Sequence, residues 1–231
     1  MKSSRTIFIK QAKDMFRNSA VLVQFIIFPA VALIMTELIA KSNDDIPNNM
    51  FVTIMAAIFC GMALITSTSV IIAEDIERKS LRLLIMAGVK PHEYLIGIGG
   101  FILLGGALTS VIFTLIGDFA MVERFKFLTV MIGSITASII LGTILGMMSK
   151  NQQAATAISM PIAMILGFTP MIADFNETIE RLASVLYTQQ LNVIVNDFSA
   201  NFATAMVIIT LNIAVLAILF ALVYKKLFKT F

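Results

Sequence analysis

Long apolar runs separated by short polar segments dominate the chain. Six of these runs are long enough for a spanning helix, which needs about 20 apolar residues. They cover approximately residues 19–39, 50–73, 93–117, 127–148, 153–169 and 201–224. Pro29 and Pro161 lie inside two of them, where a kink is tolerated because neighbouring helices satisfy the freed backbone groups. The pattern predicts an all-α membrane protein with six transmembrane helices, forming one membrane domain over residues 1–231.

Before the first run, residues 4–18 alternate with the period of an amphipathic helix. Such a helix lies in the membrane interface, with its basic side chains near the headgroups. We therefore expect an N-terminal interfacial helix, and a basic N-terminal flank is the alternative. Its apolar face comprises Phe8, Ala12, Met15 and Phe16, and its polar face comprises Lys10, Lys13, Asp14 and Arg17.

The segment 170–199 is too long for a turn and too polar to span the membrane. Asp174 and Glu177 have the spacing of a capping box, and a helical repeat of apolar residues follows. This pattern predicts one or two short helices that dip into the outer leaflet before the last span, and an ordered outer loop is the alternative. The repeat consists of Phe175, Ile179, Leu182 and Leu186.

Composition agrees with a membrane protein. The chain is 58% hydrophobic and 13% charged, whereas soluble domains are about 45–50% apolar and about 25% charged. Most Lys and Arg residues fall in segments that lie on the same side of the membrane as the N-terminus. Of the 17 Lys and Arg residues, the outside segments hold only Lys41, Arg124, Lys126 and Arg181. The positive-inside rule therefore predicts that both termini are cytoplasmic. The usage of Lys, Ile and Asn suggests an AT-rich bacterium, so we expect the membrane to be a bacterial plasma membrane.

This orientation makes residues 74–88 a cytoplasmic loop between the second and third spans. Glu74 and Arg78 are four residues apart, as are Arg78 and Arg82, so the segment has a charged helical face. Gly88 can end the helix. We therefore expect a short amphipathic helix that either rests on headgroups or docks into a partner. Its adjoining apolar face comprises Ile76, Ser80, Leu83, Leu84 and Ala87.

Two features inside the spans predict helix packing. Ser134, Ser138, Gly142 and Gly146 are each four residues apart, and a stripe of small residues lets another helix approach closely. Gln24 and Asn212 are polar residues well inside spans, and we expect each to bond a neighbouring helix.

The sequence contains no motif that would supply energy or catalysis. It has no GxxxxGK[ST] phosphate loop and no series of carboxylates through the spans, as a proton-driven carrier would often have. With one histidine and one cysteine, metal catalysis is improbable. We therefore expect a chain that is not an enzyme, that binds no cofactor or metal itself, and that has no nucleic-acid partner.

The order of elements and two local motifs resemble the membrane subunit of type-2 ABC exporters, the ABC2-type permeases. That family has an E-x-G-[TS]-L-like pattern after the second span, and Glu77, Ser80 and Leu81 match it within "ERKSLRLLIMAGVKP". Lys79 stands at the glycine position, and "AGVKP" replaces the more usual turn that begins with proline. The stretch "SKNQQAATAISMPIAMILGFTP" also resembles the family's turn into the fifth span.

The resemblance implies a mechanism and partners. Residues 74–88 would be the coupling helix that sits in a cleft of a separate cytoplasmic ABC ATPase, which would bind ATP and Mg. Residues 4–18 would be the connecting helix that braces the ATPase, chiefly through Phe8, Lys10, Lys13, Phe16 and Arg17. A second permease chain, identical or related, would pack on the first and fifth spans. The coupling residues would be Glu74, Asp75, Glu77, Arg78, Ser80, Leu81, Leu84 and Gly88.

The substrate is inferred from the apolar residues available to line a pathway. They favour a hydrophobic or amphipathic cargo, such as a peptide, an antibiotic or a lipid-like molecule, exported by ATP hydrolysis in the partner subunit. The alternatives are a carrier that works without ATP and a membrane scaffold that transports nothing itself.

Overall fold

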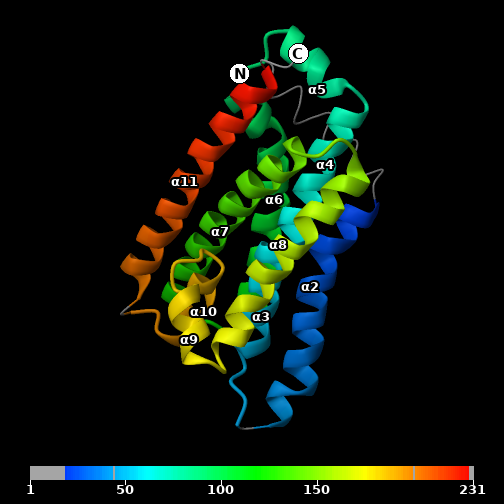
Figure 1. Ribbon diagram of the computed structural model, residues 1–231. Coiled ribbons are helices and arrows are strands. Elements are labelled where there is room, and N and C mark those ends of the chain that lie inside the picture. Colours follow the sequence, from blue (N-terminus) through cyan, green and yellow to red (C-terminus); the bar gives the residue numbers. More distant parts are fainter. Residues whose placement is uncertain (1–18, 44, 200, 229–231) are drawn as a thin grey trace.

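The computed structural model describes residues 19–43, 45–199 and 201–228. Throughout these residues the regular elements are helical, and six helices are long and apolar enough to cross a membrane (Figure 1). The predicted all-α membrane fold with six spans is thus confirmed. The spans are formed by α2 (Ser19–Leu38), by α3 (Met50–Ile58), η2 (Phe59–Leu64) and α4 (Ile65–Glu77) as one continuous helix, and by α6 (Pro91–Ile116), α7 (Met121–Met147), α8 (Gln152–Ala173) and α11 (Phe202–Phe228).

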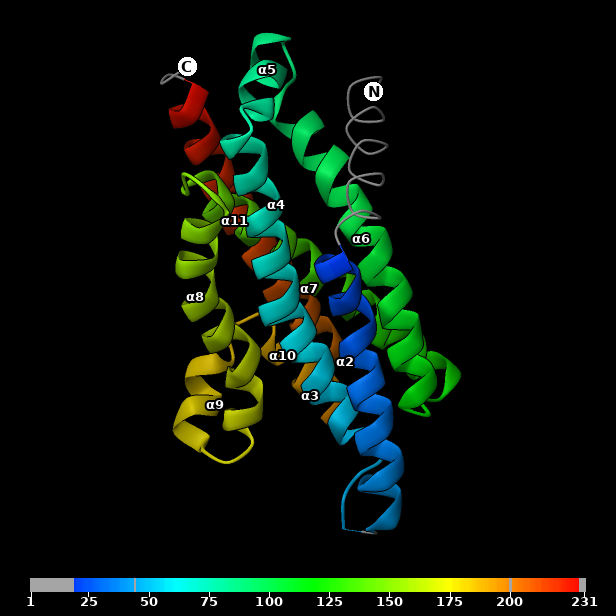
Figure 2. The same ribbon diagram turned by 90° about the vertical axis from the view of Figure 1, so that its right-hand side faces the viewer.

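Four short elements lie at the two ends of this bundle. The helix α5 (Ser80–Met86) stands at one end, beside the C-terminal end of α11, while α9 (Glu177–Ala183) and α10 (Gln189–Asn196) stand at the other (Figures 1 and 2). A 3-10 turn, η1 (Ala40–Ser42), follows α2. We refer to these ends as the α5 end and the α9 end. The predicted connecting helix, with Phe8, Lys10, Lys13, Phe16 and Arg17, falls outside the described residues.

The second span is the central helix of the bundle and packs between α7 and α8. On α7, the stripe of Ser134, Ser138, Gly142 and Gly146 is fully buried. A Cβ at Gly142 would lie 2.7 Å from the carbonyl oxygen of Ile65, so α7 and α4 touch through their backbones. A second stripe on α8, which the sequence did not lead us to expect, has the same spacing of four and lies on the side of α8 that packs on the second span. It comprises Ala155, Ser159, Ala163 and Gly167.

Several spans extend beyond their apolar runs because polar groups at their ends are satisfied locally. The fourth span begins at Met121 instead of about 127, since Glu123 Oε2 accepts a hydrogen bond of 2.9 Å from the backbone N–H of Ala120. The fifth span continues through Pro170 to Ala173, and the second continues to Glu77. Hydropathy alone therefore underestimates the length of helices whose end turns carry charged residues.

The predicted capping box at the α9 end is wrong. Asn176 caps α9, because its side chain accepts hydrogen bonds from the N–H groups of Thr178 and Ile179 at 2.9 and 3.1 Å. Asp174 ends α8 and accepts a hydrogen bond from the side chain of Asn192. Of the predicted apolar repeat, Phe175 and Leu182 are 78% and 73% exposed, whereas Ile179 and Leu186 are half-buried. That these helices dip into the outer leaflet stays a prediction.

Candidate functional site

The charged segment between the second and third spans forms a sharp corner, so the prediction of one helix over 74–88 is wrong. The helix α4 ends at Glu77, and α5 begins at Ser80. Between them Lys79 adopts a φ of 59°, in the left-handed region. The N–H groups of Arg78 and Lys79 still bond the carbonyls of Glu74 and Ile76. Lys79 occupies the position where the resembling pattern has glycine, which explains that glycine physically, because glycine adopts a positive φ without strain.

We expect Lys79→Gly to stabilise the corner. A left-handed conformation costs a residue with a side chain about 1–2 kcal/mol, and glycine's extra freedom in the unfolded chain offsets about 0.5–1 kcal/mol of this gain. The free energy of unfolding should therefore rise by up to about 1.5 kcal/mol, measurable by thermal unfolding in detergent. Arg78→Gly is the matched control, since φ is −79° there, and it should lower the stability instead.

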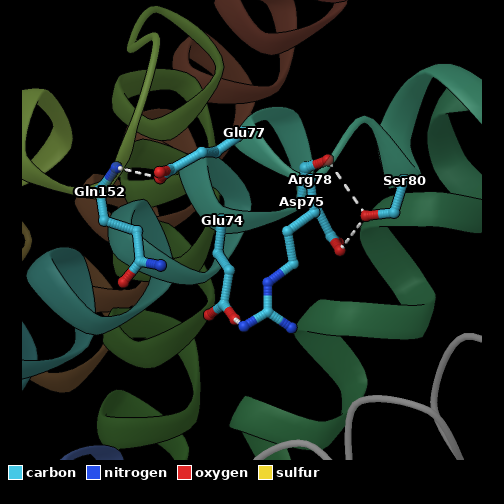
Figure 3. Close-up of polar contacts among 6 residues, drawn as sticks. All are labelled: Glu74, Asp75, Glu77, Arg78, Ser80 and Gln152. Atoms are coloured by element: carbon cyan, nitrogen blue, oxygen red, sulfur yellow. Dashed lines mark hydrogen bonds and ion pairs between the residues drawn. The ribbon is translucent and has the colours of Figure 1, made fainter.

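Polar side chains connect this corner to α5 and to α8 (Figure 3), and a further bond comes from α6. The hydroxyl oxygen of Ser80 lies 2.6 Å from Oδ1 of Asp75, and the hydroxyl of Tyr94 in α6 donates to Oδ2 at 3.1 Å. Asp75 is only 6% exposed. Oε2 of Glu77 accepts a 3.2 Å bond from the backbone N–H of Gln152, in the first turn of α8. The corner thus joins α4 directly to α5, α6 and α8.

Glu74 and Arg78 also lie at the corner, but they pair with each other and not with another helix. Glu74 and Arg78 form a 2.7 Å ion pair along α4, and the Arg78 side chain is 70% exposed. An exposed pair of this kind contributes little to stability, so Arg78 is available for contact with another molecule.

One face of α5 is anchored and the opposite face is open. Leu81 is 1% exposed and belongs to the main hydrophobic core, whereas Leu83 is 61% and Met86 65% exposed. Leu84 is half-buried. Gly88, with a φ of 80°, turns the chain after α5, and the hydroxyl of Tyr224 in α11 donates to the carbonyl of Val89 at 3.3 Å. The predicted coupling residue Leu81 therefore packs inside the chain. The exposed apolar surface of α5 is formed by Leu83 and Met86, which were not among the predicted coupling residues.

A comparison with protein-family models matches residues 3–188 to the family described as ABC-2 type transporter. The match includes the corner and all spans except the last. The chain belongs to this family. A comparison with curated proteins found no match. As an ABC-2 transporter, the chain is the permease subunit of an ABC transporter, a multi-pass membrane protein that partners an ABC ATPase and the lipid bilayer.

This ABC-2 permease has a groove between its first and second spans, near the middle of the bundle. Its volume is about 450 Å³. The side-chain oxygen of Gln24 accepts a hydrogen bond from Ser67 beside it, so Gln24 bonds a neighbouring helix as expected. Sequence reasoning missed the other lining residues, which carry no signal beyond being apolar or weakly polar. The lining comprises Val23, Gln24, Ile27, Phe28, Met62, Ala63 and Thr66.

A second groove of about 280 Å³ lies along α11 of the permease, near the α9 end. The amide of Asn212 donates to the carbonyls of Val185 and Ile208 at 2.8 and 2.9 Å. Asn212 therefore ties the last span to the segment after α9. Among the described residues, no group of three His, Cys, Asp or Glu side chains could hold a metal ion.

Proposed function

We propose that this permease belongs to an ATP-driven exporter in which a separate subunit binds ATP and Mg and hydrolyses the nucleotide. The observation that carries the proposal is the two-sided character of α5. Its inner face is held through Leu81 and Ser80, and its outer face offers Leu83 and Met86. A helix that is rigidly attached to the spans and has an unpartnered apolar surface suits a docking element.

The connections of α5 support a role in transmitting movement. Asp75 links α5 to α4 and α6, and Glu77 links the end of α4 to α8. A displacement of α5 by the ATPase would therefore act on three spans at once, since each is bonded to the same corner. Closure of two ATPase subunits would in this way change the arrangement of the bundle.

The distribution of basic residues supports a cytoplasmic α5 end. Basic side chains near the ends of spans favour the cytoplasmic face, and exposed cations cluster at this end, which would put both termini in the cytoplasm of a bacterial cell. These cations are Arg78, Lys79, Lys90, Lys150, Lys225 and Lys226.

The groove beside Gln24 supports a hydrophobic or amphipathic cargo, such as a peptide, an antibiotic or a lipid-like molecule. Its lining is mostly apolar, with one amide and one hydroxyl that could orient a cargo. The first and fifth spans, α2 and α8, expose apolar side chains that a second permease chain, identical or related, could cover. They include Ile26, Leu33, Ile34, Met160, Met164 and Ile165.

The test is co-purification of the ATPase encoded beside this chain, through a tag on the permease. We expect an active ATPase to bind the unchanged permease. Leu83→Asp and Met86→Asp should reduce its recovery at least about tenfold, because each puts a charge into an apolar contact. Both substitutions should leave the amount of folded permease unchanged, since both side chains are exposed.

Met148→Asp is the matched control. Met148 is 61% exposed at the same end of the bundle, but it lies outside α5, so its substitution should leave ATPase recovery unchanged. Full recovery of the ATPase with both α5 variants would rule out α5 as the docking element. If no ATPase binds the unchanged permease, the exporter proposal itself fails.

A further inference from the structure

The second span changes its helix type halfway through the bundle. Between α3 and α4, the residues Phe59–Leu64 form a π-helical turn, η2. Such turns are rare and frequently occur at functional sites. Five of the six residues are buried, so the turn is not a local defect at the surface of the bundle.

Packing fixes this turn on three sides. The ring of Phe59 contacts those of Phe25 in α2 and Phe113 in α6, with centroids 5.7 and 6.1 Å apart. On the next side, a Cβ at Gly61 would lie 2.5 Å from the Cα of Gly167 in α8. The backbones of the turn and of α8 are therefore in direct contact, and only glycine fits between them.

A hydroxyl holds the fourth side. The Oγ of Ser138 in α7 lies 2.7 Å from the carbonyl oxygen of Cys60, 2.9 Å from that of Ser134 and 3.0 Å from the hydroxyl of Tyr187. A hydroxyl has a single hydrogen. When Ser138 donates it to Cys60, the Ser138 oxygen accepts the hydrogen of Tyr187.

This short chain of bonds connects distant parts of the permease. Tyr187 is 2% exposed and immediately precedes α10. Ser138 therefore joins the π-helical turn in the middle of the second span to the short helices at the α9 end. Burial raises the pKa of the Tyr187 hydroxyl, so it stays a hydrogen-bond donor at neutral pH.

The two halves of the second span have different partners. The α4 half is enclosed by the small-residue stripes of α7 and α8, whereas the α3 half packs on α2, α8 and α10. The turn therefore lies between two parts of the span that are held by different neighbours.

We propose that η2 is a pivot in the second span and that Ser138 is the positioning residue that holds its resting form. During transport the bond from Ser138 to Cys60 is released, the turn changes its helical form, and the α3 half moves relative to α4 together with the segment that Tyr187 anchors. This role in turnover rests on the proposed function, but the bond from Ser138 to Cys60 in the resting permease can be tested without an ATPase.

Cys60 is a built-in probe of the pivot, because it is the only cysteine in the chain and is fully buried. A buried thiol is inert towards N-ethylmaleimide until water reaches it. In the purified permease we expect almost no labelling of Cys60, measured by intact-mass spectrometry. Ser138→Ala should raise the labelling rate about two- to tenfold, the opening expected when one hydrogen bond is lost.

Ser134→Ala is the matched control for the resting state. Ser134 lies on the same stripe, but its hydroxyl contacts the carbonyl of Tyr187 at 3.4 Å instead of the turn, so labelling of Cys60 should not change. An unchanged rate with Ser138→Ala, or an equal rise with Ser134→Ala, would overturn the pivot.

In the complex with its ATPase, ATP turnover should raise Cys60 labelling at least about tenfold over the nucleotide-free complex. The control carries Cys60→Ala and Ala137→Cys, which moves the thiol to a fully buried site on α7 outside the turn. Labelling there should not respond to ATP. A rise at both sites indicates general opening and overturns the pivot, as does no rise at Cys60. Absence of a bound ATPase would count against the proposed function alone, and the resting-state comparison would still decide the pivot.

Discussion

Gly61→Ala is expected to destabilise the permease by about 3 kcal/mol or more, although it adds only one methyl group. Inserting a methyl group into a packed core costs about 1–3 kcal/mol, and more when nothing can move aside. At Gly61 the new Cβ would lie 2.5 Å from both the Cα and the backbone nitrogen of Gly167. Because backbone atoms cannot rotate away as a side chain can, α8 would have to separate from the second span.

Gly167→Ala provides the comparison from the other side of the same contact. A Cβ there would first meet Cβ of Met62 at 3.2 Å, a contact that a shift of a few tenths of an ångström relieves. Its cost should be about 1 kcal/mol or less, since alanine also favours the helix by about that amount. Thermal unfolding in detergent, followed by size-exclusion chromatography, would measure both. Equal melting temperatures would mean that the two helices are not in backbone contact.

The second large effect is expected at Leu81. Truncation of a fully buried leucine to alanine costs about 2–5 kcal/mol, and Leu81 is 1% exposed between α5 and the core. Leu81→Ala should therefore lower the melting temperature strongly. At Leu83, 61% exposed two residues further on, the same substitution should change the free energy of unfolding by no more than about 0.5 kcal/mol.

This pair also separates folding from docking. Leu81→Ala should reduce ATPase recovery only in proportion to the loss of folded permease, whereas Leu83→Asp should reduce recovery with the folded fraction intact. Folded-fraction measurements on both variants, made beside the co-purification, check this. A stable Leu81→Ala protein would mean that α5 is not anchored through this side chain.

The spans could be predicted from the sequence because the bilayer imposes a single requirement on them, a continuous apolar length. The family resemblance could be recognised from the order of the elements along the chain. The ends of the spans and the charged segment after the second span are visible in the sequence as polar interruptions. Gln24 and Asn212 were each expected to bond a neighbouring helix. Gln24 does so, whereas Asn212 bonds the connection between α9 and α10 at Val185.

The periodicity of the sequence did not predict the break in the charged segment, because that break depends on the backbone conformation of a single residue. The helical spacing of Glu74 and Arg78 continues smoothly towards Arg82, yet one left-handed residue at Lys79 divides the segment. The only signal was the glycine that the resembling pattern has at that position. Leu81 and Leu83 differ in burial because residues two apart point in nearly opposite directions from a helix. The corner sets which of the two faces of α5 turns inward.

The π-helical turn is invisible in the sequence, since an apolar run reads the same whether its carbonyls bond four or five residues ahead. Asn176 was missed as the cap of α9 because Asp174 and Glu177 have equally suitable spacing. Which of these residues caps α9 depends on tertiary contacts, here the bond between Asp174 and Asn192.

The bond between Glu77 and the backbone of Gln152 has a consequence for biosynthesis. These residues are 75 positions apart, and ribosomes add about 5–20 residues per second, so α4 is complete roughly 4–15 s before the start of α8 exists. During that interval the side of the second span that will meet Ala155, Ser159, Ala163 and Gly167 has no partner within the chain. Insertion of this permease therefore includes a stage at which only lipid or the insertion machinery can cover that side of its central helix.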